Sequence, residues 1–333
     1  MQCNLSKARP AILTALLPFV TVLLLASGSP TAAADAVSSP WGADYFPNVP
    51  LVTHEGHPVR FFDDLIKDKV VIINFIFTSC PDVCPLETAR LREVQKILGD
   101  RVGQDVFMYS ISIDPDVDTP EVLKRYASRY EAGPGWLFLT GSKEDTTLLR
   151  RKLGLYRENE PGLSQHSTNM IIGNQKTGRW TKISPYENPY IIATQVGSWL
   201  HNWKLPPRTG QDYASAPEVR TISKGESLFR TRCGACHTIG ADAAADAVKG
   251  ALGPDLFDVH RKRDRVWLTR WLMEPDKMLA EKDPLALTLL AEWNNVPMPN
   301  LRLTESDVAE LLTYIAEESH RVEHSRHGGH HHH

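Results

Sequence analysis

The first two thirds of the chain alternate between strand-like and helix-like patterns. Residues 70–77 are apolar at every position except Asn74, as is typical of a central strand covered on both faces. Further elements are expected along the same region: strands at 105–113, 136–140 and 169–172, and helices at 120–130 and 191–203. This alternation over residues 40–204 predicts an α/β domain in which at least some strands are parallel.

The pattern changes after this region. Residues 205–218 are rich in proline, glycine and small polar residues and keep no period, so they are expected to form a linker. From residue 219 to 322 the spacing of apolar residues is helical. The last helix is expected after Thr304, where four apolar residues share one face, Val308, Leu311, Leu312 and Ile315. The sequence therefore predicts two domains, the second of them all-α.

Both ends of the chain differ from these domains. Residues 1–34 combine Lys7 and Arg9 with an apolar run and a small-residue stretch, which indicates an export signal. The alternative is an uncleaved membrane anchor. The tail at 323–333 is rich in histidine, and it is either a purification tag or a native metal-binding tail.

The length and net charge of the chain limit the kinds of function to be expected. A chain of 333 residues is long enough to bury two cores. Its 37 basic and 40 acidic side chains give a net charge of -3, without a basic block. Nucleic acid is therefore not an expected partner.

Cysteine spacing carries the strongest chemical signal. Cys3 lies in the expected export signal, and the other four cysteines form two close pairs. Cys233 and Cys236 are followed directly by His237, the spacing by which two thioethers attach a haem while the histidine binds its iron. Covalent haem c is therefore the first expected cofactor.

Residues 220–320 resemble a class I cytochrome c domain, because Gly-Pro-Asp-Leu at 253–256 follows the haem motif and Pro-Met-Pro-Asn at 297–300 precedes the last helix. The resemblance implies that a methionine ahead of that helix is the sixth iron ligand. Met298 occupies this place, and Met273 and Met278 are the alternatives. Methionine and histidine ligands together suit electron transfer.

The other pair, Cys80 and Cys84, follows the apolar strand at 70–77, and each cysteine precedes a proline. Cys84 is expected to cap a helix that begins at Pro85, so the thiols would lie where the helix dipole favours thiolate. Two soft thiolates suit Cu(I), and a neutral imidazole as third ligand would also hold Cu(II). A redox dithiol and a structural disulfide remain alternatives.

Residues 45–203 resemble the Sco/SenC family of copper proteins. The resemblance rests on Thr-Ser-Cys-Pro-Asp-Val-Cys-Pro at 78–85 and Ser-Ile-Asp-Pro-Asp-Val-Asp-Thr-Pro at 112–120. It implies a thioredoxin-like fold, a role in assembling the binuclear copper centre of cytochrome c oxidase, and copper bound by Cys80, Cys84 and a distant histidine. His166 matches that histidine, although Gln165 stands where the family usually has an acid.

Other candidate ligands in this domain are less suitable. His54, His57 and His201 lie in different local contexts. Three acids in the second motif are expected to form turns and to flank a helix cap rather than to bind copper, Asp114, Asp116 and Asp118.

Together these features predict an exported protein, periplasmic or on the outer face of the cytoplasmic membrane. It would contact the membrane itself only if its N-terminal segment is retained. Its expected function is copper-centre assembly of cytochrome c oxidase, with electron transfer through haem c. The expected partners are the oxidase copper subunit or another cuproprotein, together with redox proteins. Two alternatives stay open: a thiol-disulfide reductase that uses Cys80 or Cys84, and a protein that is chiefly an electron carrier.

Overall fold

The computed structural model describes residues 41–158, 162–163, 166–201, 221–241 and 251–328. The expected export signal at 1–34 and the expected linker at 205–218 lie outside these residues. The last described helix runs to Gly328, so it includes part of the tail expected at 323–333.

The elements of the α/β region are strands β1 (Pro50–Thr53), β2 (Pro58–Arg60), β3 (Val70–Ile76), β4 (Val106–Ser112), β5 (Trp136–Thr140), β6 (Met170–Asn174) and β7 (Arg179–Ile183), with helices α1 (Cys84–Leu98), α2 (Pro120–Arg129), α3 (Lys143–Lys152) and α4 (Pro189–Gly197) and short turns η1 (Phe61–Ile66), η2 (Gly99–Arg101) and η4 (Trp199–His201). The C-terminal region consists of α5 (Lys224–Leu228), the short turn η6 (Phe229–Cys233), α6 (Val259–Lys262), α7 (Arg265–Met273), α8 (Pro275–Ala280), α9 (Pro284–Glu292) and α10 (Glu305–Gly328).

The seven strands form one mixed sheet in the order β2-β1-β5-β4-β3-β6-β7. β3 runs parallel to β4, and β4 runs parallel to β5. β6 and β7 continue antiparallel on one side, and β1 and β2 do so on the other. The expected α/β domain with some parallel strands is therefore confirmed.

β3 lies inside the sheet between β4 and β6, and all seven of its residues are buried. The one polar residue, Asn74, is satisfied inside the core. Its amide donates to Glu87 Oε1 at 3.0 Å, and its carbonyl oxygen accepts from the Ser110 hydroxyl at 2.7 Å. Because a buried polar group is costly without partners, this hydrogen-bonded chain explains why the apolar run can contain an asparagine.

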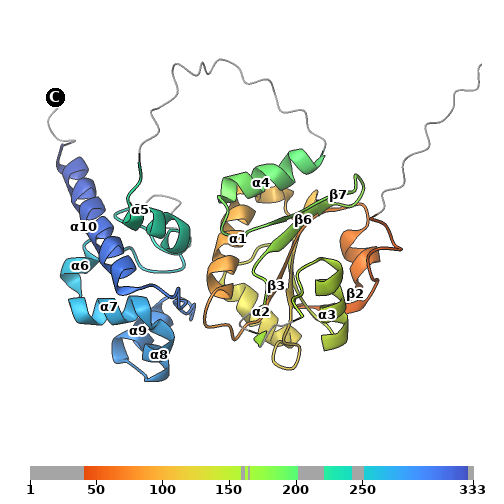
Figure 1. Ribbon diagram of the computed structural model, residues 1–333, viewed down its shortest axis with the longest axis horizontal. Helices are drawn as coiled ribbons and strands as arrows, with labels where there is room; N and C mark the ends of the chain where they lie inside the picture. The colour runs from red at the N-terminus through yellow and green to blue at the C-terminus, as the bar shows by residue number, and fades with distance from the viewer. Residues whose placement is uncertain (1–40, 159–161, 164–165, 202–220, 242–250, 329–333) are drawn as a thin grey trace, which may run out of the picture. The chain divides into compact units, whose positions relative to one another are not determined.

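Helix α1 begins one residue earlier than the sequence indicates. Val83 is its N-cap, Cys84 is already helical, and Pro85 lies in the first turn, where a missing N–H costs nothing. Leu91, Val94 and Leu98 lie on one face of this helix and are buried. α1 packs against α4 and reaches α2 through a hydrogen bond, whereas α3 lies across the strands from α4 (Figure 1).

Helix α4 ends earlier than expected, at Gly197 rather than near residue 203. The chain then turns through η4, because the carbonyl of Leu200 accepts from the Asn174 amide at 2.6 Å and that of Trp199 accepts from Arg179 at 3.2 Å. Tertiary hydrogen bonds thus replace the next turn of the helix.

The C-terminal region is helical throughout its described elements, as expected. The predicted face of α10 is buried together with Leu268 and Leu272 of α7. Helix α5 contacts α10 so closely that a Cβ on Gly225 would lie 2.2 Å from the backbone oxygen of Glu310. Only glycine permits this approach.

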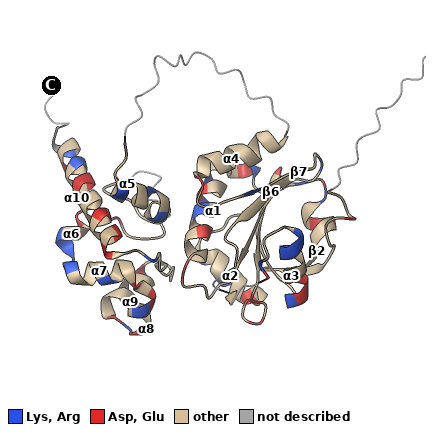
Figure 2. Cartoon of the chain, viewed as in Figure 1, with Lys and Arg blue, Asp and Glu red and all other residues tan. Residues whose placement is uncertain are grey.

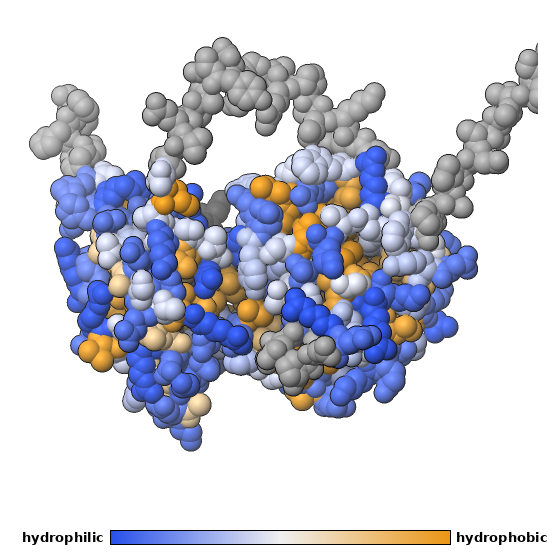
Figure 3. All heavy atoms as spheres, in the orientation of Figure 1, coloured by the Kyte–Doolittle hydropathy of each residue, from blue (hydrophilic) through white to orange (hydrophobic). Residues whose placement is uncertain are grey.

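Charged side chains of both signs are interspersed along α1 and α10 (Figure 2). On the face drawn in Figure 3, apolar atoms occupy several separate areas among hydrophilic ones. Among the described helices, none has the length and apolar character needed to cross a membrane.

Candidate redox and metal sites

The first cysteine pair lies where β3 meets α1. Cys80 is 4% exposed and Cys84 is fully buried. Cys80 N–H donates to the Phe77 carbonyl at 3.3 Å, which closes a tight turn after the strand. Both residues carry thiols in the structure, and no disulfide joins them. The sequence therefore folds into two adjacent buried thiols at a helix N-terminus.

The two thiols differ in acidity. A hydrogen bond from the Cys84 thiol is the main cause that lowers the pKa of Cys80 to about 6, and backbone N–H groups of Asp82, Val83 and Cys84 act in the same direction. The pKa of Cys84 is raised, first by that same hydrogen bond and then by burial. Near neutral pH the pair is therefore one thiolate, Cys80, beside one thiol, Cys84.

His166 lies beside this pair, in the loop before β6. Its Nε2 is 3.8 Å from Cys84 Sγ, and its ring packs edge-on against Phe77 with 5.8 Å between ring centroids. The Nδ1–H donates to the Ser167 carbonyl at 3.0 Å, so the lone pair of Nε2 faces the sulfur. This hydrogen bond fixes the tautomer that a metal ligand needs.

The structure brings the three predicted copper ligands together as neighbours, Cys80 beside Cys84 and Cys84 beside His166. Within the described ranges, no three His, Cys, Asp or Glu side chains already converge on one metal position. Binding by all three would therefore need a small side-chain movement.

The alternative histidines lie elsewhere in the domain. His54 Nδ1 accepts from the Phe138 backbone at 3.2 Å, and His57 is exposed beside the same β1–β2 turn. His201 is in η4, where burial lowers its pKa. In the described structure, His166 is thus the histidine that contacts the cysteine pair.

Asp118 has a larger role than the sequence indicates. We expected a turn former, but its carboxylate is fully buried and accepts from the Thr78 backbone N–H at 3.1 Å. It also accepts from the hydroxyls of Thr78 and Ser112. Asp118 therefore ties the segment that leads into Cys80 to the end of β4, and the burial that shows this is not readable from the motif.

Glu87 is a second residue that sequence reasoning missed. It lies three residues after Cys84 on α1 and is fully buried. Burial raises the pKa of Glu87 to about 8, although the hydrogen bond from Asn74 opposes this shift. Its Oε2 has no hydrogen-bond partner within the described structure. A protonated carboxyl group is therefore the stable form at neutral pH beneath the cysteine pair.

The second cysteine pair spans the end of η6 and the turn that follows it, with Cys233 as the last residue of η6. The backbone N–H groups of Cys236 and His237 both donate to the Cys233 carbonyl, at 3.0 and 2.9 Å. This turn brings both thiols and the imidazole to the same region. The local geometry is therefore the one that two thioethers and an axial histidine require.

A hydrogen bond to Pro254 and the close approach of Gly253 fix the orientation of the His237 ring. Its Nδ1–H donates to the Pro254 carbonyl at 2.8 Å, which leaves Nε2 as the metal-binding nitrogen. Burial lowers the pKa of His237, so the imidazole is neutral. A Cβ on Gly253 would lie 2.5 Å from His237 Cε1, so only glycine leaves room for this ring.

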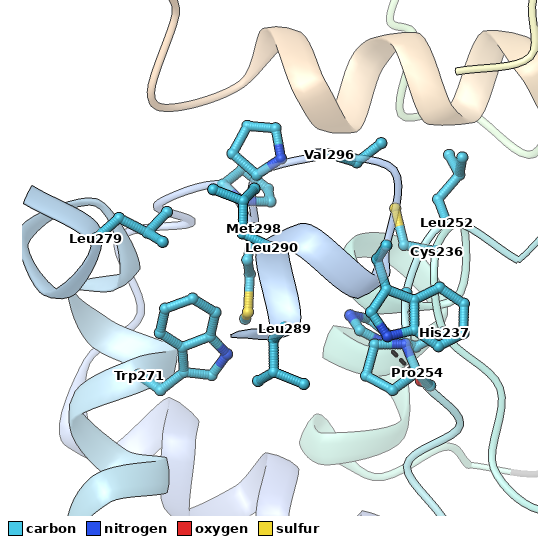
Figure 4. A pocket seen from close by; sticks show the side chains of 14 residues that line it. Cys236, His237, Leu252, Pro254, Trp271, Leu279, Leu289, Leu290, Val296 and Met298 are labelled. Carbon is cyan, nitrogen blue, oxygen red and sulfur yellow. Dashed lines mark hydrogen bonds between the residues drawn. The ribbon is translucent and has the colours of Figure 1, made fainter. Parts of the chain in front are cut away.

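An apolar cavity of about 360 Å³ adjoins these groups, and its lining includes Cys233, His237, Trp271, Met298, Leu311 and Ile315. Cys236 borders a smaller hollow that shares His237 and Met298. Figure 4 shows the Met298 sulfur directed between Trp271 and Leu289, with His237 also lining the hollow. These residues fit a haem with two thioethers and two axial ligands.

The alternative methionines do not line this cavity. Met273 lines a separate surface hollow with Arg270 and Glu274. Met278 is buried against Trp271 and Ala286. Their positions favour Met298 as the methionine that faces His237.

Comparison with protein-family models gives two matches, SCO1/SenC over residues 42–201 and Cytochrome c over residues 222–319. A SCO2-like protein of Rickettsia typhi is 30% identical over 149 residues, which cover 43% of this chain and 70% of that protein. A SCO2-like protein of Rickettsia felis is 38% identical over 84 residues, or 25% of this chain. The match spans only 40% of the length of that second relative.

Among solved structures, ScoI of Bradyrhizobium japonicum with copper bound is 25% identical, with a TM-score of 0.38. The match covers 46% of this chain and 98% of that structure. The α/β region has the Sco-like thioredoxin fold, and the helical region matches cytochrome c. The chain therefore belongs to the SCO1/SenC family and carries a cytochrome c domain in the same polypeptide.

Proposed function

We propose that this protein binds copper through Cys80, Cys84 and His166 and delivers it to a copper centre of cytochrome c oxidase. The observation that carries the proposal is the contact of Cys84 Sγ with His166 Nε2 at 3.8 Å, beside the Cys80 thiol. Sco homologues bind copper, and their family implies partners in oxidase assembly. The ligand type supports the same cargo, because two soft sulfurs and one imidazole suit copper in both oxidation states.

Copper is the cargo of this site. The Cys80 thiolate is available near neutral pH, and the Cys84 thiol loses its proton when copper binds. The two sulfurs then hold Cu(I), and His166 adds the nitrogen donor that Cu(II) requires. Release to thiolates of an acceptor protein proceeds by exchange of these ligands, one at a time, without a change in the oxidation state of copper.

In the second domain, Cys233 and Cys236 would hold haem c by thioethers, with His237 and Met298 as axial ligands. The haem supplies a one-electron redox couple when bound. Pro254 and Gly253 orient the His237 ring, and Trp271, Leu311 and Ile315 keep water from the cavity. We propose that this couple would exchange one electron with the copper, or two electrons in succession with the thiols.

Proteins of these families are typically extracytoplasmic. We place the present chain in the periplasm or on the outer face of the cytoplasmic membrane. Covalent haem c and thiol chemistry both fit an oxidising compartment.

The lowered pKa of Cys80 favours a second candidate function, a thiol-disulfide reductase. In such a reductase the Cys80 thiolate attacks a partner disulfide, and the resulting mixed disulfide is resolved by Cys84. Two electrons pass from the Cys80–Cys84 dithiol to the partner, which is released as a dithiol. A third possibility, a protein that is chiefly an electron carrier, rests on the haem motif alone.

The deciding experiment is copper analysis of the haem-loaded protein in which the histidines at 320, 324, 327 and 330–333 are replaced by alanine. We expect one copper per chain, loss of tight Cu(I) binding in Cys80→Ser and in Cys84→Ser, and a larger loss for Cu(II) than for Cu(I) in His166→Ala. His57→Ala is the matched histidine control. Full copper retention in the double cysteine variant would refute the site, and turnover of a disulfide substrate without copper binding would establish the reductase.

A further inference from the structure

The end of α10 is fixed on one of its faces. Ser319 is buried, where its hydroxyl donates to the Ile315 carbonyl at 2.7 Å and accepts from Asp258 N–H at 3.0 Å. Further along, Arg326 donates to the Gly240 carbonyl at 2.8 Å and its guanidinium lies 5.1 Å from the Phe257 ring centre. Val322 packs against Gly240 on the same face. The last described turns are therefore held in place by tertiary contacts.

His320 and His324 lie on the other face of these turns. Four residues separate them, so their side chains are one turn apart and adjacent. Both are exposed. Their rings are 4.2 Å apart between centroids at an angle of 71°, and their Nε2 atoms are 3.1 Å apart. Neither residue takes part in the core or in the two sites described above.

This separation matches two ligands of one metal ion. Imidazole nitrogens bind Zn²⁺ at roughly 2.0–2.1 Å, so two nitrogens 3.1 Å apart subtend an angle of about 95–102° at a shared ion. That angle suits adjacent positions in octahedral or square-planar coordination. A hydrogen bond between two neutral rings has the same nitrogen–nitrogen distance, and the two arrangements differ in their affinity for a divalent cation.

We infer that His320 and His324 form a two-nitrogen site for a borderline divalent cation, such as Ni²⁺, Cu²⁺ or Zn²⁺, with water in the remaining positions. Two imidazoles and no thiolate select cations of this class over Cu(I) and over hard cations such as Mg²⁺. The helix is already held at Ser319, Val322 and Arg326, so little conformational freedom is lost when the ion binds. This two-histidine site takes no part in the copper transfer proposed for Cys80, Cys84 and His166.

The test uses Ni²⁺ alone and the haem-loaded full chain. To remove other soft or imidazole donors, the starting protein carries Cys80→Ser and Cys84→Ser and has alanine in place of histidines 327 and 330–333. Calorimetric titration should show one Ni²⁺ per chain. His320→Ala or His324→Ala should weaken binding by about tenfold or more, because even a lost outer-shell partner of a metal ligand costs about 10- to 100-fold.

A matched control keeps the number of histidines and changes only their spacing. The double variant His324→Ser with Ser325→His moves the second ring away from the first by one position on an exposed helix. It should bind Ni²⁺ as weakly as the single alanine variants while the haem spectrum is unchanged. Equal binding by this spacing variant, or no measurable Ni²⁺ binding by the starting protein, overturns the inference and leaves a histidine–histidine hydrogen bond.

Discussion

Cys84 Sγ and His166 Nε2 lie 3.8 Å apart, although 82 residues separate them along the chain. The cysteine is brought there by the turn from β3 into α1, and the histidine by the loop that leads into β6. Because β3 and β6 are neighbours in the sheet, this contact follows directly from strand pairing. The candidate copper site is thus a product of the central sheet and not of one local motif.

Asp118→Asn should disturb the cysteine site although Asp118 is expected to bind no metal. The new amide would keep one acceptor oxygen and replace the other by an N–H₂ group, so either the Thr78 or the Ser112 hydroxyl would lose its acceptor. We expect the free energy of unfolding to fall by about 2 kcal/mol or more. If Asp118 positions Cys80, the Cu(II) charge-transfer band and the dithiol reduction potential will shift as well.

Asp116→Asn, two residues away and exposed, is the control for this substitution. It should leave the free energy of unfolding, the Cu(II) charge-transfer band and the dithiol reduction potential unchanged. A loss of stability in Asp118→Asn with an unchanged copper spectrum and potential would assign Asp118 a structural role only.

The reactivity of Cys80 should depend on pH in a defined direction. Because a thiolate attacks iodoacetamide and a thiol does not, alkylation should rise about tenfold per pH unit below pH 6 and level off above it. The haem-loaded protein suits this measurement, since Cys233 and Cys236 are then thioethers. In Cys84→Ala the side-chain donor that is the main cause of the shift is gone, so the midpoint should move to higher pH.

Mass spectrometry of the alkylated peptide measures this profile directly. A wild-type midpoint near the ordinary thiol value of about 8.5 would show that Cys84 does not stabilise the Cys80 thiolate.

Glu87 should make the domain less stable as the pH rises. Its pKa is about 8 in the folded state, above its ordinary value, so between roughly pH 4.5 and 8 the folded protein binds a proton that the unfolded chain has released. The free energy of unfolding therefore falls across this window, by at most about 1.4 kcal/mol per pH unit. Glu87→Gln keeps the shape of the side chain but has no ionisable group. Denaturant unfolding at several pH values should therefore show a free energy of unfolding that depends less on pH in this variant. A parallel slope in both proteins would exclude Glu87 as its source.

Gly253→Ala should impair the haem site through one contact. The added Cβ would lie 2.5 Å from His237 Cε1, and the ring cannot retreat without loss of its hydrogen bond to Pro254. We expect a lower yield of haem-loaded protein and an altered low-spin spectrum, measured by absorption after expression in a host that matures haem c.

Gly234→Ala is the matched glycine control for Gly253→Ala. Gly234 lies between the two haem cysteines, but its nearest neighbour would be 3.5 Å from the added Cβ, an ordinary contact. Equal loss of haem in both variants would mean that the effect does not arise from crowding of His237.

The parts of this protein that could be predicted from sequence are those that local chemistry determines. Thr119 accepts from the Val122 N–H, so the expected start of α2 at Pro120 is confirmed. The run at 70–77, apolar except at Asn74, became β3, a strand buried inside the sheet. The haem motif needs only one helical turn, so its residues were predictable by spacing, although their ligation remains a proposal.

The rest depends on contacts between distant segments. His166 could be selected only by resemblance to a family, because nothing near it in the sequence indicates the cysteines. The burial of Asp118 and Glu87 results from packing of α1, β3 and the loop after β4, which no periodicity shows. The early end of α4 has the same kind of cause, since Asn174 takes the carbonyl of Leu200.

The pairing of β6 with β3 also determines when, during folding, the imidazole of His166 can join the two thiols. Both thiols precede His166 along the chain, and the imidazole is held beside them only after β6 has paired with β3. If these three residues bind copper as proposed, the two sulfurs are present for Cu(I) before the sheet is complete, whereas the nitrogen ligand for Cu(II) is placed last. The proposed Cu(II) site would then exist only in the folded domain.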